Sequence, residues 1–279
     1  RIHYRPPSRC ALGRSQALNP YLYFLQNRGL SKSYIDKLSE YLRKYCDWLG
    51  NTSGNTLSAE SAEKFLSRSA HLKPNSRARY ATYLKGFLAH LDIPFNVKVK
   101  VPRTLPAYIE SSDLDKLYEA VKGKETHKQS IFRDLTLLKT AENTGMRRSE
   151  LANLKVRDVS LDKNRIYVRG GKGDKDRVIP LHPKLKPSLA KLIAGRGGNE
   201  SVFGLKPRSL GNKFRDWSKK AGVDLHTHSF RHYFATTLVE RGANIRAVQE
   251  LLGHSNLNTT QVYLSVTASH LEAAIELLD

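Results

Sequence analysis

The feature that most constrains the fold is an extended stretch at residues 92–108, which lies between two helical sequence patterns. It reads DIPFNVKVKVPRTLPAY, and its prolines and alternating valine and lysine residues exclude a continuous helix. A chain of 279 residues is also long enough for two domains. We therefore predict an N-terminal domain with its linker at residues 1–103 and a second domain at residues 104–279.

The N-terminal domain is predicted to be a helical bundle preceded by a flexible or extended arm at residues 1–17. Apolar side chains recur with helical spacing in four segments, at residues 19–29, 31–50, 58–70 and 75–91. In the second segment one stripe of the helix is expected to carry Tyr34, Leu38, Tyr41, Leu42, Tyr45 and Leu49.

The second domain is predicted to be mainly α, with a small antiparallel three-stranded sheet. Helical patterns at residues 111–121 and 131–145 precede three short β-prone runs, VRDVSL, RIYVRG and DRVIPL. The last two runs flank a glycine-rich hairpin tip, GKGDK. From there the pattern is helical to the end, with breaks at residues 195–199, Gly222, Gly242 and Gly253.

The charge of the chain indicates a polyanionic partner. Lys and Arg number 47 against 26 Asp and Glu, which gives a net charge of +21 and a pI near 10.0. The first 103 residues hold 18 basic and 6 acidic groups, and the remaining residues hold 29 and 20. Two positive domains favour a clamp on double-stranded DNA, because neutralised phosphates release counterions.

Other classes of protein are disfavoured. No apolar run approaches the length of a membrane span, and no basic amphipathic helix with an aromatic face indicates membrane binding. The basic N-terminus is not followed by an apolar segment, so we expect no secretory signal. Cys10 and Cys46 cannot form a disulfide framework, and we expect a reducing, cytoplasmic location.

The stretch HTHSFRH, residues 226–232, concentrates imidazole and guanidinium groups at the start of a predicted helix. His228 and Arg231 share a helix face beside the core, where free backbone N–H groups favour an anion. The alternative is a solvated basic helix end. The core stripe is expected to contain Phe230, Tyr233, Phe234, Thr237 and Leu238. No carboxylate or Cys lies at a ligand spacing from these histidines or His254, so we expect no metal and no cofactor.

Three further motifs contain candidate functional residues, each with a structural alternative. In TGMRRSEL, Glu150 is placed to orient a basic neighbour such as Arg147, unless the two form an ordinary surface pair. In GGKGDKDR, Lys172 lies at a hairpin tip that can enter a groove, or is an exposed turn lysine. In LGHSNLNTTQVY, Tyr263 becomes a nucleophile if cations lower its pKa from ~10, but it is one of 13 tyrosines.

Taken in this order, the motifs TGMRRSEL, GKGDKDR, HTHSFRH and LLGHSNLNTTQVY resemble the tyrosine recombinase/integrase family, and most closely its Xer-type members. The resemblance covers about residues 107–270. Residues 1–103 are similar in pattern to the SAM-like core-binding domain of this family. The resemblance implies a site-specific recombinase that cleaves and rejoins DNA through a 3′-phosphotyrosyl intermediate, without ATP or metal. Such a recombinase would serve chromosome-dimer resolution, or integration and excision of a mobile element.

The same resemblance implies a role for each motif residue. Arg147 and Arg231 would hold the scissile phosphate, and Glu150 would brace the site. Lys172 would protonate the leaving 5′-oxygen, while His228 would assist proton transfer at the nucleophile, Tyr263. His254 would support the phosphate. The DNA contacts are expected to include Arg77, Arg79, Lys85 and Lys175.

The resemblance also implies self-association, as a dimer on one site and a tetramer in the synapse. Residues 268–279 carry Leu271, Ala274, Ile275 and Leu278 on one stripe, which suits docking on a neighbouring subunit or, alternatively, on the same domain. Two other functions remain open. One is a type IB topoisomerase-like enzyme that nicks and reseals one strand, and the other is a DNA-binding protein without turnover.

Overall fold

The computed structural model describes residues 17–51, 56–102, 109–124, 128–169 and 176–253. The chain divides into two compact units, Arg1–Leu105 and Pro106–Asp279. Each unit encloses its own cluster of buried apolar side chains. Nearly all of the expected arm, residues 1–16, lies outside the described residues, as does the tail at residues 268–279.

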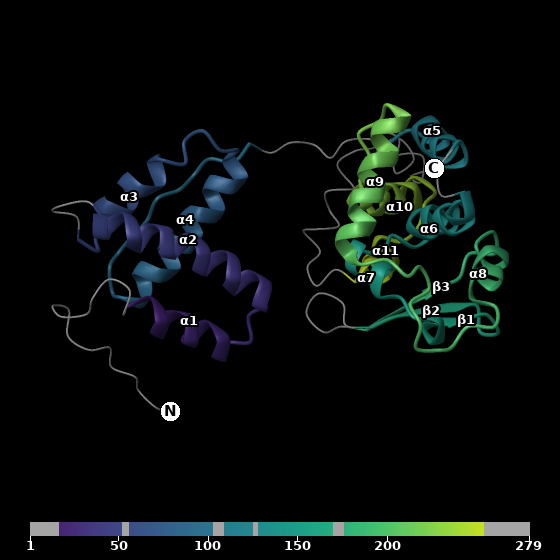
Figure 1. The fold of residues 1–279 in the computed structure, drawn as a ribbon, viewed down its shortest axis with the longest axis horizontal. Helices are drawn as coiled ribbons and strands as arrows, with labels where there is room; N and C mark the ends of the chain where they lie inside the picture. Colours follow the sequence, from purple (N-terminus) through teal and green to yellow (C-terminus); the bar gives the residue numbers. More distant parts are fainter. Residues whose placement is uncertain (1–16, 52–55, 103–108, 125–127, 170–175, 254–279) are drawn as a thin grey trace, which may run out of the picture. The chain divides into compact units, whose positions relative to one another are not determined.

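Within its described residues the first unit is a bundle of four α-helices (Figure 1). They are α1 (Leu18–Asn27), α2 (Lys32–Asn51), α3 (Ala59–Ser67) and α4 (Pro74–His90). Helix α3 begins with a capping box, in which Ser58 Oγ accepts from the backbone N–H of Ser61 at 3.1 Å. Proline at the first position of α4 suits a helix start, since its missing N–H has no helical partner there.

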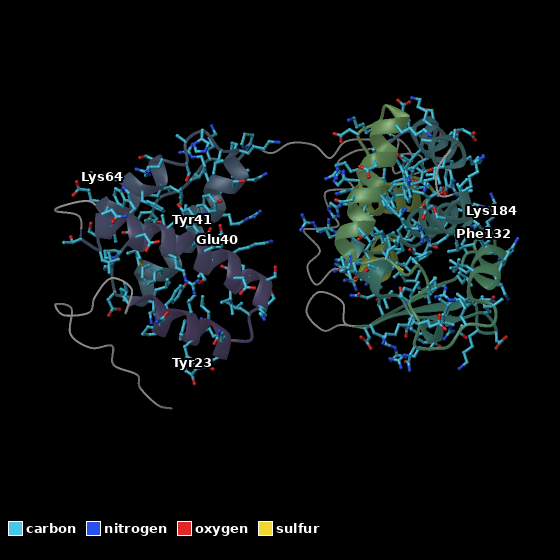
Figure 2. All side chains as sticks on the ribbon, viewed as in Figure 1. Tyr23, Glu40, Tyr41, Lys64, Phe132 and Lys184 are labelled. Atoms are coloured by element: carbon cyan, nitrogen blue, oxygen red, sulfur yellow. The ribbon has the colours of Figure 1, made fainter. Side chains whose placement is uncertain are left out.

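Helix α2 supplies more of the buried core of this bundle than any other helix of the described residues. Leu42, Tyr45 and Leu49 are fully buried, as the apolar stripe predicts. Tyr34, the first residue of the same stripe, keeps 36% of its surface exposed, while its neighbour Ile35 is buried. Tyr34 lies in the first turn of α2, at the edge of the bundle, where its ring packs edge-on against Tyr83. Exposure is greater on α1, where Tyr23 points into solvent (Figure 2).

The second unit is mostly helical around a small sheet, as expected. Its helices within the described residues are α5 (Ser111–Lys122), α6 (Ile131–Thr144), α7 (Arg148–Asn153), α8 (Lys186–Ile193), α9 (Pro207–Ala221), α10 (Thr227–Glu240) and α11 (Ile245–Leu252), with 3₁₀ turns η1 (Lys128–Ser130) and η2 (Val156–Asp158). Helix α6 packs on α10, and α9 packs on α5 and α7. Helix α11 contacts both α10 and the last strand.

The sheet is antiparallel with strand order β1-β2-β3, and it lies at one end of the second unit (Figure 1). The strands are β1 (Val159–Ser160), β2 (Arg165–Val168) and β3 (Arg177–Pro180). Strand β1 is shorter than the expected run 156–161, because the first three residues of that run form the turn η2. Ile166 pairs with Ile179, and both are buried, so one face of the sheet packs on the core.

Candidate active site

Arg231 lies on α10 and is the largest fully buried side chain of the described residues, with 1% of the residue exposed. The sequence placed it at the edge of the core, and the structure places it inside. Its guanidinium donates to the backbone oxygens of Gly145, at 2.9 Å, and Leu252, at 2.5 Å. A buried charge is costly unless it is hydrogen-bonded, and these oxygens end α6 and α11, where helix dipoles favour a cation.

Glu150 is the centre of a second group of contacts. Its carboxylate accepts from Arg147 Nη1 at 2.7 Å and from the Arg147 backbone N–H at 2.7 Å. It also accepts two hydrogen bonds from Arg177, at 2.9 and 2.8 Å. The expectation that Glu150 orients a basic neighbour is thus met twice, by two guanidinium groups on one carboxylate.

The pKa of Glu150 reflects this surrounding charge. Burial alone would raise the pKa, but the hydrogen bonds and charge of Arg177, with the hydrogen bonds from Arg147, lower it to about 2. The carboxylate therefore remains charged at neutral pH. It serves to hold guanidinium groups in place and is not a proton carrier near pH 7.

The last turn of α11 joins the two groups of contacts. Its final carbonyl oxygens accept from three different guanidiniums: Leu251 O from Arg177 at 2.7 Å, Leu252 O from Arg231, and Gly253 O from Arg147 at 3.3 Å. We call Arg147, Arg177, Arg231 and Glu150 the arginine cluster. The C-terminal end of a helix attracts cations, so α11 stabilises the cluster and the cluster fixes where α11 ends.

Two glycines permit these close approaches. Gly145 ends α6 with a φ of +57°, and a Cβ there would lie 2.6 Å from Phe234 Cδ1. Gly253 ends α11 with a φ of +63°, and a Cβ there would lie 3.0 Å from Arg177 Cδ. Both positions require the left-handed backbone conformation that glycine adopts most readily.

The three histidines of HTHSFRH differ in their surroundings. His226 is the N-cap of α10, and its Nδ1 lies 2.7 Å from Ser229 Oγ, which indicates a structural role. His228 is exposed in the first turn of α10. Desolvation lowers its pKa, and the positive charges of Arg231, His226 and Arg147 lower it further. A neutral imidazole at pH 7 can accept a proton.

His232, which had no assigned role, packs against His228. The two ring centroids lie 4.5 Å apart in an edge-on arrangement. Burial, followed by the charges of His228, His226 and Arg231, lowers the pKa of His232 to about 4. This imidazole is therefore neutral over the physiological range.

Several expected site residues lie outside the described residues: Lys172, Lys175, His254 and Tyr263. The chain is described on both sides of Lys172 and Lys175, and it is described up to Gly253 before His254 and Tyr263. Lys172 belongs to the connection between β2 and β3, and His254 directly follows Gly253, whose carbonyl contacts Arg147.

The expected DNA contacts of the first unit lie on α4. Arg79 and Lys85 are exposed, and Lys85 Nζ lies 3.4 Å from Asn96 Oδ1. Arg77 is half-buried, and its Nε has no hydrogen-bond partner among the described residues. Residues two apart do not share a helix face, so Arg77 and Arg79 point in different directions from α4.

Sequence reasoning missed Arg177. The signal was present in DRVIPL, because alternation along a strand places Arg177 on the same face as Ile179, which is buried. An arginine at an inward-facing strand position needs a buried acidic partner, and Glu150 was already a candidate.

Two further features are absent from the described ranges. No group of three or more His, Cys, Asp or Glu side chains that could hold a metal ion occurs among these residues, which do not include His254. Nor does any helix in the same ranges have the length and apolar character needed to cross a bilayer.

Comparison with known proteins identifies the family. The Phage integrase family matches residues 107–270. The tyrosine recombinase XerA of Thermococcus kodakarensis is 34% identical over 281 residues, which cover 94% of this chain and 95% of that protein.

Two solved structures share the fold. XerH site-specific recombinase bound to palindromic difH substrate in a post-cleavage complex has a TM-score of 0.71 at 24% identity, covering 96% of this chain and 85% of its own. A lambda integrase tetramer bound to a Holliday junction has a TM-score of 0.74 at 17% identity, covering 92% and 78%. From the family match and the XerA relative it follows that this chain belongs to the phage integrase family of tyrosine recombinases, enzymes that cleave and rejoin DNA.

Proposed function

We propose that this chain is a site-specific DNA recombinase that forms a 3′-phosphotyrosyl intermediate through Tyr263. The observation that carries the proposal is the arginine cluster, in which two guanidiniums of the family motifs are held by backbone oxygens and Glu150. A side chain fixed in this way loses little freedom when a phosphate binds. The side chain of Arg147 keeps 24% of its surface exposed, so it can still reach a ligand.

The proposed reaction needs only groups of the protein. Tyr263 attacks the phosphorus, a bond forms between its oxygen and the phosphorus, and the bond from phosphorus to the 5′-oxygen breaks. Negative charge grows on the non-bridging oxygens, where planar guanidiniums are suitable donors. His228 takes the tyrosine proton and Lys172 protonates the leaving 5′-oxygen. The phosphotyrosyl bond conserves the energy of the broken linkage, so rejoining requires neither ATP nor metal.

The decisive experiment uses nicked suicide duplexes drawn from the source genome, followed by mapping of the tyrosyl adduct. We expect a covalent protein–DNA adduct at Tyr263 that forms equally well in EDTA. Tyr263→Phe should abolish the adduct and spare DNA binding. An adduct on another residue, or a wild-type protein that binds DNA without forming one, would refute the proposal.

The same substrates separate recombination from a topoisomerase-like activity. A recombinase cleaves at a defined sequence and exchanges strands between two duplexes. An enzyme that only relaxes supercoils, without sequence preference or exchange, would support the topoisomerase alternative. A target at a chromosomal dimer site or at the end of a mobile element would then decide the biological role.

We also propose that residues 1–103 bind DNA, with contacts from Arg77, Arg79 and Lys85, and that the second domain adds Lys175. Phosphate contacts of this kind make binding salt-dependent. Each charge-removing variant should therefore reduce the slope of log affinity against log salt by about 1. An unchanged slope would remove that residue from the contact set.

Self-association follows from the same proposal, as a dimer on one site and a tetramer in the synapse. XerH was solved on a difH substrate, and lambda integrase was solved as a tetramer on a Holliday junction. Residues 268–279 supply the acidic and apolar groups that we expect to dock on a neighbouring subunit. Deleting them should abolish synapsis while leaving binding to single sites intact. Unchanged synapsis would show that the tail packs on its own domain.

A further inference from the structure

The connection that contains Lys172 has two described ends. Strand β2 leads into it and strand β3 leaves it, and Val168 opposite Arg177 is the pair of the ladder nearest the connection. Whatever fixes these two strand ends also fixes the direction in which the connection starts and returns. The two ends are held very differently.

On the β3 side, Arg177 makes three hydrogen bonds to Glu150 and to the last turn of α11. Two bonds go to the carboxylate of Glu150, and Nε donates to Leu251 O at 2.7 Å. Its side chain is only 7% exposed. A two-pronged arginine–carboxylate contact fixes orientation as well as distance, and a lysine cannot reproduce it.

On the β2 side, Arg169 makes a weaker attachment that does not reach the arginine cluster. Its Nε donates to Asp158 at 2.8 Å, and 59% of its side chain is exposed. Only the arginine end of this pair is exposed, since Asp158 is buried, and water at the guanidinium makes the contact weaker than that of the buried Arg177. The same hairpin thus offers a natural control, an arginine with an ion pair at the opposite strand end.

Glu150 makes the β3 attachment relevant to chemistry. The carboxylate that receives Arg177 also receives the side chain and backbone N–H of Arg147. The position of β3 and the position of Arg147 are therefore set by one group.

We infer that Arg177 is a positioning residue that holds Lys172 in register with the phosphate-binding arginines, by fixing the β3 end of the hairpin to Glu150 and to the last turn of α11. The inference rests on the proposed function, because it assigns Lys172 the role of acid to the 5′-oxygen. In this proposal Arg177 acts through Lys172 and not by contact with the DNA or the reacting atoms.

A sulfur atom in place of the bridging 5′-oxygen tests this role. When the bond from phosphorus to sulfur breaks, a thiolate leaves without needing a proton, because thiol pKa values are near ~8.5. A defect in delivering a proton is therefore rescued by the sulfur substrate. A defect in binding the phosphate or in folding is not rescued.

The measurement is the single-turnover rate of adduct formation on a nicked duplex of the mapped site, with oxygen or sulfur at the scissile position. Arg177→Met should slow cleavage of the oxygen substrate by about 100-fold, the lower range of general-acid effects. The sulfur substrate should restore most of the rate of Arg177→Met, and we expect the same of Lys172→Ala. Arg169→Met should leave both rates unchanged.

Arg177→Lys is a second variant for the case that Arg177→Met fails to fold. It keeps the positive charge but cannot make the bidentate contact with Glu150. We expect an intermediate oxygen-substrate rate and a full sulfur-substrate rate. Hydrogen–deuterium exchange without DNA adds an independent readout. Amides of residues 248–253 should exchange faster in Arg177→Met than in Arg169→Met.

The outcomes separate this inference from the proposed function. If the wild-type protein forms no adduct with either substrate, the proposed function fails. If the wild-type protein cleaves both, but the Arg177 variants slow both equally, only the positioning role is overturned. Unchanged amide exchange at residues 248–253 would likewise refute the anchoring of Arg177 to the end of α11, on which the positioning role depends.

Discussion

Two buried carboxylates of the second unit, Glu150 and Asp134, are each surrounded by cations, but the kinds of cation and their other contacts differ. Glu150 is held by two arginines whose remaining donors reach backbone oxygens of α11. Asp134, on α6, receives hydrogen bonds from Lys124, Lys213 and Arg133. The first arrangement orients two planar groups, whereas the second combines one planar group with two lysine ammoniums on flexible stems.

The position of each carboxylate in the fold explains this difference. Asp134 is fully buried and connects α6 to Lys124, after α5, and to Lys213 on α9. Both lysine ammoniums also lie over the ring of Trp217, at 5.1 and 5.8 Å from its centroid. This contact holds helices together. The arginine cluster lies where residues of the family motifs meet, and of the two carboxylates we propose a chemical role only for Glu150 and its arginines.

The largest expected effect comes from Glu150→Gln. It leaves two guanidiniums near a neutral amide, and breaking a buried ion pair costs about 3–5 kcal/mol. Adduct formation should also fall, because Arg147 loses its orienting group. Urea denaturation and single-turnover cleavage measure the two effects. A variant as stable as the wild type would mean that the backbone oxygens alone hold the cluster.

Acid should weaken the wild type through the same carboxylate. The folded-state pKa of Glu150, about 2, lies below its usual value of 4.5, so its contribution is present above pH 4.5 and is lost as pH falls toward 2. The difference corresponds to roughly 3 kcal/mol at 1.36 kcal/mol per pKa unit. Unfolding free energies measured from pH 5 to pH 2 should fall less steeply in Glu150→Gln. Parallel curves for the two proteins would contradict the pKa assignment.

Gly145→Ala tests the backbone segment whose carbonyl oxygen accepts a hydrogen bond from Arg231. The added Cβ would overlap Phe234, and overpacking of this kind costs about 1–3 kcal/mol beyond the cost of the left-handed backbone. Gly204→Ala is the matched control, since Gly204 has a φ of +62° and a Cβ there would meet nothing within 4 Å. The midpoint temperature of thermal unfolding should be lower for Gly145→Ala than for Gly204→Ala. Equal losses would show that backbone strain alone matters.

The smallest effect is expected from Asp134→Asn. The cations around Asp134 are partly exposed, at 28% for the side chain of Lys213 and 29% for that of Arg133, so they can turn toward water when the charge is removed. We expect a loss of about 1–2 kcal/mol from weaker hydrogen bonds. Cleavage by the folded protein should be unchanged. A cleavage defect as large as that of Glu150→Gln would erase the distinction between the two carboxylates.

Much of the fold could be predicted because its signals are local. Helical spacing identified the segments of α2 and α4, and the alternating runs identified β2 and β3. Tyr34 stays partly exposed for a simple reason: periodicity shows which residues share a face, but not where a bundle ends. The first strand was overestimated because VRDVSL has strand-like composition throughout, whereas its first half closes a turn on Asp158.

Spacing and order along the chain were enough to predict the helical class with its small sheet and the family, because these depend on local pattern. The burial of Arg231, the sharing of Glu150 by Arg147 and Arg177, and the contacts of all three arginines with the end of α11 became known from the folded chain. The physical reason is distance along the chain. Arg231 meets an oxygen 86 residues away, and Arg147 meets one 106 residues away. Such contacts arise from how helices pack, which no local pattern encodes.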